Sequence, residues 1–160
     1  MDARTGVAAV IIYSEREELV RELLRADWRL SIVLEDLARE AALLDLDVMV
    51  TSVYRTDAET RAIYELAGRT PPGASVHGTS PVRGVDAVPF ETRGAGGPLP
   101  PRSETALHEI AQALAAKVCL RIRYPRGLKA VLWHDVGGGA HWHVQVPYDG
   151  LELVADVFRV

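Results

Sequence analysis

The feature that most constrains the fold is a pair of apolar segments separated by a run of glycines. The segments are Leu128–Trp133 and His141–Pro147, and the turn between them, His134–Ala140, contains three successive glycines. Two such segments joined by a glycine-rich turn are typical of a β-hairpin. Because a hairpin pairs its strands antiparallel, we expect an α+β domain with a small antiparallel sheet flanked by helices, rather than a doubly wound parallel sheet.

The rest of the chain alternates segments typical of helices and of strands. Four helices are expected, each where a capping residue precedes apolar positions at helical spacing. The capping residues are Ser14, Asp27, Thr56 or Asp57, and Ser103. After Asp27 the apolar stripe is Leu30, Val33, Leu34, Leu37, Ala41 and Leu44. Further strands are expected at Gly6–Tyr13, Val48–Tyr54 and Gly84–Val88, and a long surface loop at Glu91–Arg102.

Size and charge limit the classes of protein. A chain of 160 residues fits one domain. Its net charge of −4 argues against a dedicated nucleic-acid binder, which usually carries a basic surface. The single cysteine, Cys119, excludes an internal disulfide. No apolar stretch is long enough for a membrane span, and no complete signal-peptide pattern is visible, so we expect synthesis in the cytoplasm. The oligomeric state is left open.

The histidines are concentrated in three polar, glycine-rich segments. Two of them, His141 and His143, are two residues apart on an expected strand, so their side chains point to the same face. Two imidazoles on one face can supply two metal ligands, or one ligand and one proton-transfer group. The alternative is a pair of polar residues on a solvated strand face.

An aspartate in an apolar strand is the second unusual feature. Asp86 lies among the apolar residues of Gly84–Val88, where a carboxylate incurs a desolvation cost unless it is paired, hydrogen-bonded or bound to a cation. It could pair with Arg83 or Arg55, or cap a turn. His77 lies in a nearby loop, where it could simply be exposed. Taken with the His-x-His pair, however, these residues favour a metal site.

Two imidazoles and one carboxylate would leave one zinc position open. Three protein ligands with a water molecule are typical of hydrolytic zinc sites, whereas structural sites have four ligands, usually including cysteine. Imidazole with carboxylate also suits zinc better than copper(I) or an iron–sulfur cluster. The sequence therefore predicts a Zn²⁺ cofactor.

These residues, in this order, resemble a known family. Thr51-Ser-Val-Tyr-Arg55, Ser75-x-His77 with Gly-Val-Asp86, and His141-x-His143 are similar to the D-Ala-D-Ala carboxypeptidase-like peptidases. That family belongs to a wider group with the lysostaphin-type peptidases and the Hedgehog signalling domain. The resemblance extends from about Val48 to Val146 and implies a Hedgehog/DD-peptidase-like fold. Within the 1–160 domain, it implies a helical N-terminal part over 1–46 and a metal-site core over 47–147.

The resemblance also implies roles for individual residues. His77, Asp86 and His143 correspond to the zinc ligands, and His141 to a non-ligand histidine that helps stabilise the charged intermediate. Arg55 resembles an arginine that contacts substrate carboxylate or carbonyl groups, although it could instead pair with Asp57 or Glu59. Ser75 resembles a serine that contacts either a ligand or the substrate.

Two departures from the family pattern concern the loops. The spacing from His77 to Asp86 is two residues longer than usual. The glutamate that the enzymes usually place shortly before the last histidine is also absent, since Gly137, Gly138 and Ala140 stand there. The nearest candidates for a general base are Asp135 and His134. Without either, the site would bind zinc but not cleave.

The expected function is therefore that of a zinc peptidase acting on peptidoglycan stem peptides, as a D,D-carboxypeptidase or an endopeptidase. An endolysin-like enzyme of phage type, released through membrane holes, would need no export signal. The alternatives are a non-catalytic zinc module that binds peptide or protein, and a domain whose histidines are incidental.

Overall fold

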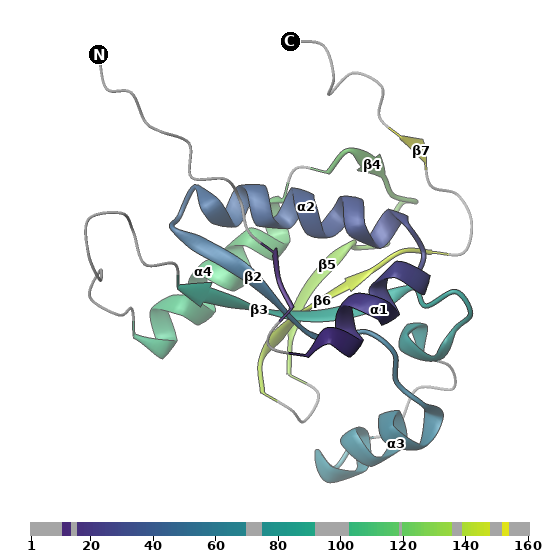
Figure 1. Ribbon diagram of the computed structural model, residues 1–160. Helices are drawn as coiled ribbons and strands as arrows, with labels where there is room; N and C mark the ends of the chain where they lie inside the picture. Colours follow the sequence, from purple (N-terminus) through teal and green to yellow (C-terminus); the bar gives the residue numbers. More distant parts are fainter. Residues whose placement is uncertain are drawn as a thin grey trace, which may run out of the picture.

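The computed structural model describes residues 11–13, 16–69, 75–91, 103–118, 120–135, 139–147 and 152–153. Its centre is a five-stranded sheet in the order β1-β2-β3-β6-β5 (Figure 1). These strands are β1 Ile11–Ile12, β2 Leu46–Ser52, β3 Gly84–Glu91, β5 Val131–His134 and β6 His141–Gln145. A second sheet pairs β4 (Ile122–Arg123) with β7 (Glu152–Leu153). The helices are α1 Glu17–Arg25, α2 Arg29–Ala42, α3 Asp57–Leu66 and α4 Glu104–Lys117, with a 3₁₀ turn, η1, at Val76–Gly78.

The sheet is mostly antiparallel. Strands β2 and β3, β3 and β6, and β5 and β6 pair antiparallel, which confirms the predicted hairpin and the α+β character. One pairing departs from a purely antiparallel sheet, because β1 runs parallel to β2. Parallel neighbours need a crossover connection, and α1 and α2 lie between β1 and β2 in the chain.

The helix starts follow the capping residues. Thr56 forms a capping box with Glu59: Thr56 Oγ1 accepts from the Glu59 N–H at 3.2 Å, and Glu59 Oε2 accepts from the Thr56 N–H at 2.8 Å. Ser103 Oγ accepts from the backbone of α4 at 3.2 Å. Asp27 Oδ1 accepts from the Arg29 N–H at 3.1 Å, although α2 begins only after Trp28. Ser14 lies outside the described residues.

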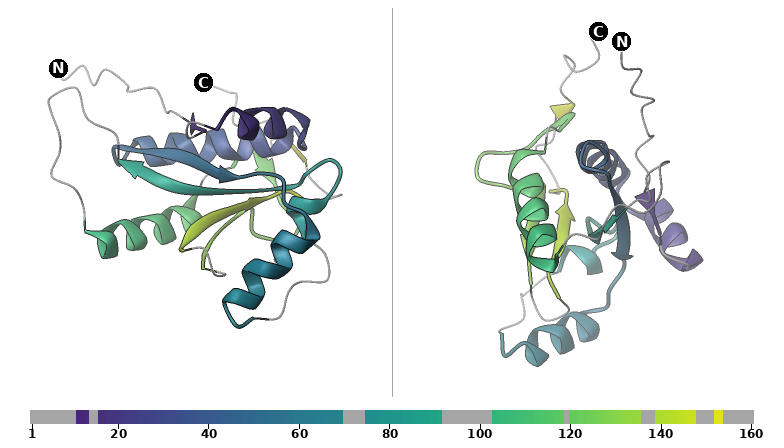
Figure 2. Two further views of the ribbon diagram at one scale, coloured as in Figure 1. Left: turned by 60° about the horizontal axis from the view of Figure 1, so that its bottom comes forward. Right: turned by 90° about the vertical axis from the view of Figure 1, so that its left-hand side faces the viewer.

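The apolar core lies between the sheet and helices α2 and α4 (Figure 2). The predicted stripe on α2 is buried from Leu30 to Ala41, but Leu44 lies beyond the end of the helix and is 39% exposed. Trp142 of β6 is fully buried, and its Nε1–H donates to the Ala111 carbonyl of α4 at 2.8 Å. Because side chains alternate along a strand, the neighbours of Trp142 in β6 project from the opposite face.

None of the described helices is long and apolar enough to cross a membrane. The predicted loop after Glu91 and the single cysteine, Cys119, lie outside the described residues. Strand β3 runs through Pro89 to Glu91, three residues beyond its predicted end.

Candidate metal centre

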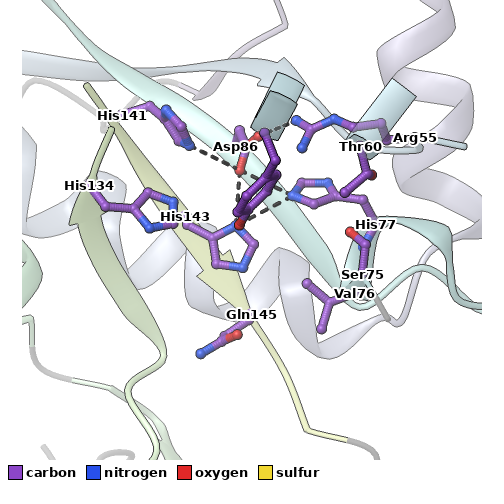
Figure 3. A pocket seen from close by; sticks show the side chains of 11 residues that line it. Arg55, Thr60, Ser75, Val76, His77, Asp86, His134, His141, His143 and Gln145 are labelled. Atoms are coloured by element: carbon purple, nitrogen blue, oxygen red, sulfur yellow. Dashed lines mark hydrogen bonds and ion pairs between the residues drawn. The ribbon is translucent and has the colours of Figure 1, made fainter. Parts of the chain in front are cut away.

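Two histidines and an aspartate from three separate elements meet on the face of the sheet opposite Trp142. His77 comes from η1, Asp86 from the middle of β3, and His143 from β6 (Figure 3). Asp86 Oδ1 lies 3.1 Å from His77 Nε2 and 3.0 Å from His143 Nδ1, and the two imidazole nitrogens are 3.3 Å apart. The structure therefore brings all three predicted ligands together, with His77 and Asp86 buried and His143 partly buried.

Local structure explains this convergence. Asp86 is the direct register partner of His143 in the β3–β6 pair, so both side chains lie on the same face. His77 reaches the same place because η1 packs on β3 at Gly84, where a Cβ would lie 2.4 Å from Val76 Cγ2. Ser75 caps η1, with its Oγ accepting from the His77 N–H at 3.2 Å. Ser75 thus supports a predicted ligand.

Hydrogen bonds fix the orientation of two histidine rings. His77 Nδ1 lies 2.8 Å from the Val53 carbonyl oxygen, and His141 Nδ1 lies 2.8 Å from the Gly139 carbonyl oxygen. Since a carbonyl oxygen only accepts, each Nδ1 carries the hydrogen. The Nε2 atom of a neutral His77 would then present a lone pair to Asp86 Oδ1. Such an arrangement, with a carbonyl behind the ring, is the usual support of a metal-binding histidine.

The spacing of the three atoms fits a small divalent cation. Tetrahedral zinc with bonds of about 2.0–2.1 Å holds its ligand atoms about 3.3–3.4 Å apart. The observed separations are 3.0, 3.1 and 3.3 Å. Lone pairs on a carboxylate oxygen and an imidazole nitrogen repel at such distances unless a proton or a cation lies between them. The His77-Asp86-His143 group can therefore hold a metal ion.

The second oxygen of Asp86 is held by Arg55. Arg55 Nη2 donates to Asp86 Oδ2 at 2.5 Å and to Ser52 Oγ at 3.1 Å. Burial would raise the pKa of Asp86, but hydrogen bonds from His143 and His77, with the charges of His77 and His141, hold that pKa well below its usual range. Of the pairings considered for Arg55, the described residues show the one with Asp86, and not one with Asp57 or Glu59.

The two general-base candidates are placed differently. His134 lies opposite His141 in the hairpin register and lines the cavity at the metal centre, whereas Asp135 is exposed and is not among the lining residues. Burial, followed by the charges of His141 and His143, lowers the pKa of His134 to about 4. His141 Nε2 lies 3.6 Å from Asp86 Oδ1. Both Gly137 and Gly138 lie outside the described residues.

A cavity of about 180 Å³ opens beside the three ligands. The sequence did not predict four of its lining residues: Thr60, Tyr64, Val76 and Gln145. A signal existed for Gln145, because it lies two residues after His143 on the same strand face. Thr60 and Tyr64 are one helical turn apart on α3, but nothing in the sequence says which face of that helix meets the site.

Comparison with known proteins identifies no relative of this chain. No protein-family model, no curated protein and no solved structure matches this chain. The chemistry of the site itself therefore indicates what the chain can do. Two imidazoles and one carboxylate at the edge of a cavity form the kind of ligand set that leaves a coordination position for water or substrate.

Proposed function

We propose that this chain is a zinc-dependent peptidase that hydrolyses an amide bond in peptidoglycan stem peptides, as a D,D-carboxypeptidase or an endopeptidase. The observation that carries the proposal is the geometry of His77, Asp86 and His143. Their three ligand atoms lie 3.0–3.3 Å apart beside a cavity of about 180 Å³. A zinc ion bound there would lower the pKa of a water molecule and polarise the substrate carbonyl.

Residues of the chain would then transfer the proton and stabilise the negative charge that develops during hydrolysis. Of the two predicted bases, His134 is the better placed, because it lines the cavity and Asp135 does not. His134 would accept a proton from the attacking water and return it to the leaving amine. His141 directs its Nε2 toward the site, since its Nδ1–H is engaged by the Gly139 carbonyl. In its protonated form, with a hydrogen on Nε2 as well, His141 would stabilise negative charge on the attacked carbonyl oxygen.

The substrate class rests on the family resemblance together with the charge of the cavity. The cavity is lined by one guanidinium and four imidazoles, with Asp86 as the one carboxylate among the described lining residues. With zinc bound, the charges of the ion and of Arg55 would together exceed that of Asp86, and a net positive cavity favours a ligand that carries a carboxylate. Stem peptides of peptidoglycan end in D-Ala and contain D-Glu, so they offer these groups. An endolysin-like role in cell-wall lysis is compatible with this substrate.

Digestion of purified peptidoglycan by the zinc-loaded protein, followed by mass analysis of the fragments, tests the proposal. Loss of a single terminal D-Ala would identify a carboxypeptidase, and release of cross-linked stems would identify an endopeptidase. The variant that tests the base is His134→Ala. We expect its zinc content to match that of the parent and its peptide hydrolysis to be strongly impaired. Full activity of that variant would show that His134 is not the base.

A second candidate is a non-catalytic zinc module that binds peptide. It is favoured by one observation: among the described lining residues, no carboxylate other than the predicted ligand Asp86 is available as a base. Protein that holds zinc stoichiometrically, binds stem peptides and leaves every amide bond intact would establish this candidate in place of the peptidase.

A further inference from the structure

Helix α3 has one buried residue, and that residue is polar. Thr60 is 4% exposed, whereas most other side chains of α3 are open to solvent. A helix that packs onto a protein normally does so through an apolar stripe. The most deeply buried side chain of α3 is thus a hydroxyl-bearing one at the wall of the metal-site cavity, while Ile63 and Tyr64 are partly buried.

The hydroxyl of Thr60 has no hydrogen-bond partner among the described residues. A threonine inside a helix can donate back to the carbonyl four residues earlier. Here that carbonyl, on Thr56, accepts the backbone N–H of Thr60 at 3.0 Å, and Oγ1 makes no bond to it. Burying a hydroxyl without a partner destabilises the folded state, so a buried hydroxyl of this kind often has a functional role.

Thr60 lies close to the predicted zinc ligands. Figure 3 shows Thr60 beside Arg55 and His77, on the side of the Asp86 carboxylate opposite His134 and His141. Tyr64, one turn further along α3, lines the same cavity. Side chains four residues apart share one face of a helix. Helix α3 therefore presents two hydroxyl-bearing residues to the space next to the predicted zinc ligands.

We propose that Thr60 is a substrate-binding residue, whose Oγ1–H donates a hydrogen bond to a carbonyl or carboxylate oxygen of a peptide held at the metal centre. This inference rests on the proposed function, because it takes a peptide as the ligand. The ligand atom is an oxygen acceptor because the cationic Arg55 lies on the same side of the cavity and would repel a positively charged donor. A peptide offers such oxygens at every residue and at its C-terminus.

The experiment compares Thr60→Val, which keeps the shape and removes the hydroxyl, with Thr60→Ser, which keeps the hydroxyl. Thr105→Val is the matched control, because Thr105 is exposed on α4. Calorimetry would measure the binding of a synthetic stem pentapeptide ending in D-Ala-D-Ala to the zinc-loaded proteins. Where cleavage occurs, kcat and KM would be measured as well. Zinc content and melting temperature would be recorded for each variant.

We expect Thr60→Val to weaken peptide binding, or raise KM, about tenfold, the usual scale for a lost hydrogen bond to a charged or polar ligand. Zinc content should be unchanged, and the melting temperature should stay the same or rise, because a buried hydroxyl without a partner has been removed. Thr60→Ser and Thr105→Val should bind as the parent does. A purely structural threonine would give the opposite pattern, with lower stability and unchanged affinity.

The outcomes separate this inference from the proposed function. Unchanged peptide affinity in Thr60→Val overturns the inference, and so does a loss of zinc or of stability that accounts for the weaker binding. A parent protein that binds the pentapeptide without cleaving it contradicts the peptidase, while the Thr60 comparison still decides the binding role. A parent protein that does not bind the pentapeptide at all overturns the inference as well.

Discussion

Two buried aspartates show how one residue type is used in different ways in this molecule. Asp36 of α2 is fully buried, and donors of the protein occupy both of its oxygens. Oδ1 accepts from Arg121 Nε at 2.5 Å and from Arg39 Nη2 at 3.0 Å, while Oδ2 accepts from the Arg121 N–H at 2.9 Å. Asp86 is also buried, but only its Oδ2 meets a guanidinium, that of Arg55.

The difference lies in what faces the remaining oxygen. The donors on Asp36 always carry hydrogen, since arginine stays protonated and a backbone amide has a fixed hydrogen. Asp86 Oδ1 instead faces two imidazole nitrogens that can lose theirs, at 3.0 and 3.1 Å. A carboxylate surrounded by permanent donors is a closed ion pair. A carboxylate shared between one permanent donor and two imidazoles can exchange protons for a metal ion.

The strongest test of this contrast is Asp86→Asn. An amide is a poor zinc ligand, so we expect zinc affinity to fall by more than the roughly 100-fold that loss of an outer-shell partner can cost. Peptide hydrolysis should disappear with it. In the parent, zinc at about 100 times its dissociation constant should stabilise the fold by about 2.7 kcal/mol, and the melting temperature should rise. Titration calorimetry measures the zinc affinity of both proteins, and scanning calorimetry measures their melting temperatures with and without zinc. Full zinc binding by the variant would contradict the ligand assignment.

Asp36→Asn should lower the stability of the fold and leave zinc affinity unchanged. Breaking a buried ion pair from one side costs about 3–5 kcal/mol. Asp36→Asn removes the buried carboxylate charge that faces Arg121 and Arg39, while Arg121 keeps its ion pair with Glu35 at 2.8 Å. Urea unfolding of the metal-free protein would record this as a lower free energy of unfolding. Zinc affinity should match that of the parent, because Asp36 lies on α2 and not among the cavity residues. Loss of zinc binding at unchanged stability would break the comparison.

A smaller effect is expected at the arginine that Asp86 shares. Arg55→Lys keeps the charge but replaces a planar guanidinium with a single ammonium group. If Arg55 mainly positions Asp86, zinc affinity should fall about 10–100-fold, the range seen when an outer partner of a ligand is lost. Arg121→Lys is the matched control, expected to affect stability alone. A raised KM with unchanged zinc affinity would assign Arg55 to substrate contact instead.

The sequence predicted the His77-Asp86-His143 group better than it predicted the residues around that group. The hairpin, and the shared face of its two histidines, follow from local patterns: a glycine-rich turn and alternation along a strand. The sequence offered Thr56 or Asp57 as the cap of the third helix, and the structure shows Thr56, in a capping box with Glu59. In each case the signal lies within a few residues of the element it describes, so reading the chain locally was sufficient.

What the sequence left open depends on contacts between distant segments. It offered Arg83 or Arg55 as partners for Asp86, and the structure shows Arg55, 31 residues away in the chain. It offered Asp135 or His134 as the base, and only the hairpin register places His134 at the cavity. The burial of Thr60 beside the cavity was not predicted, because burial of a threonine on an otherwise exposed helix is decided by where that helix docks.

A third buried aspartate, Asp27, gives the smallest effect and a test by pH. A side-chain hydrogen bond from Arg29 lowers the pKa of Asp27, although burial acts in the opposite direction. A carboxylate with a lowered folded-state pKa stabilises the fold above its unfolded pKa of about 3.9, and this contribution is lost as the pH falls through the lower, folded value. Asp27→Asn lacks the contribution at every pH.

The free energy of unfolding of metal-free parent and Asp27→Asn should therefore differ by a constant amount from pH 7 to about pH 5. The difference should shrink as the pH is lowered below about 4, where the unfolded carboxyl group becomes protonated. Urea titrations at several pH values would measure it, with all other groups common to the two proteins. A difference that stays constant down to pH 2 would mean that Asp27 stabilises the start of α2 through its shape and hydrogen bonding rather than its charge.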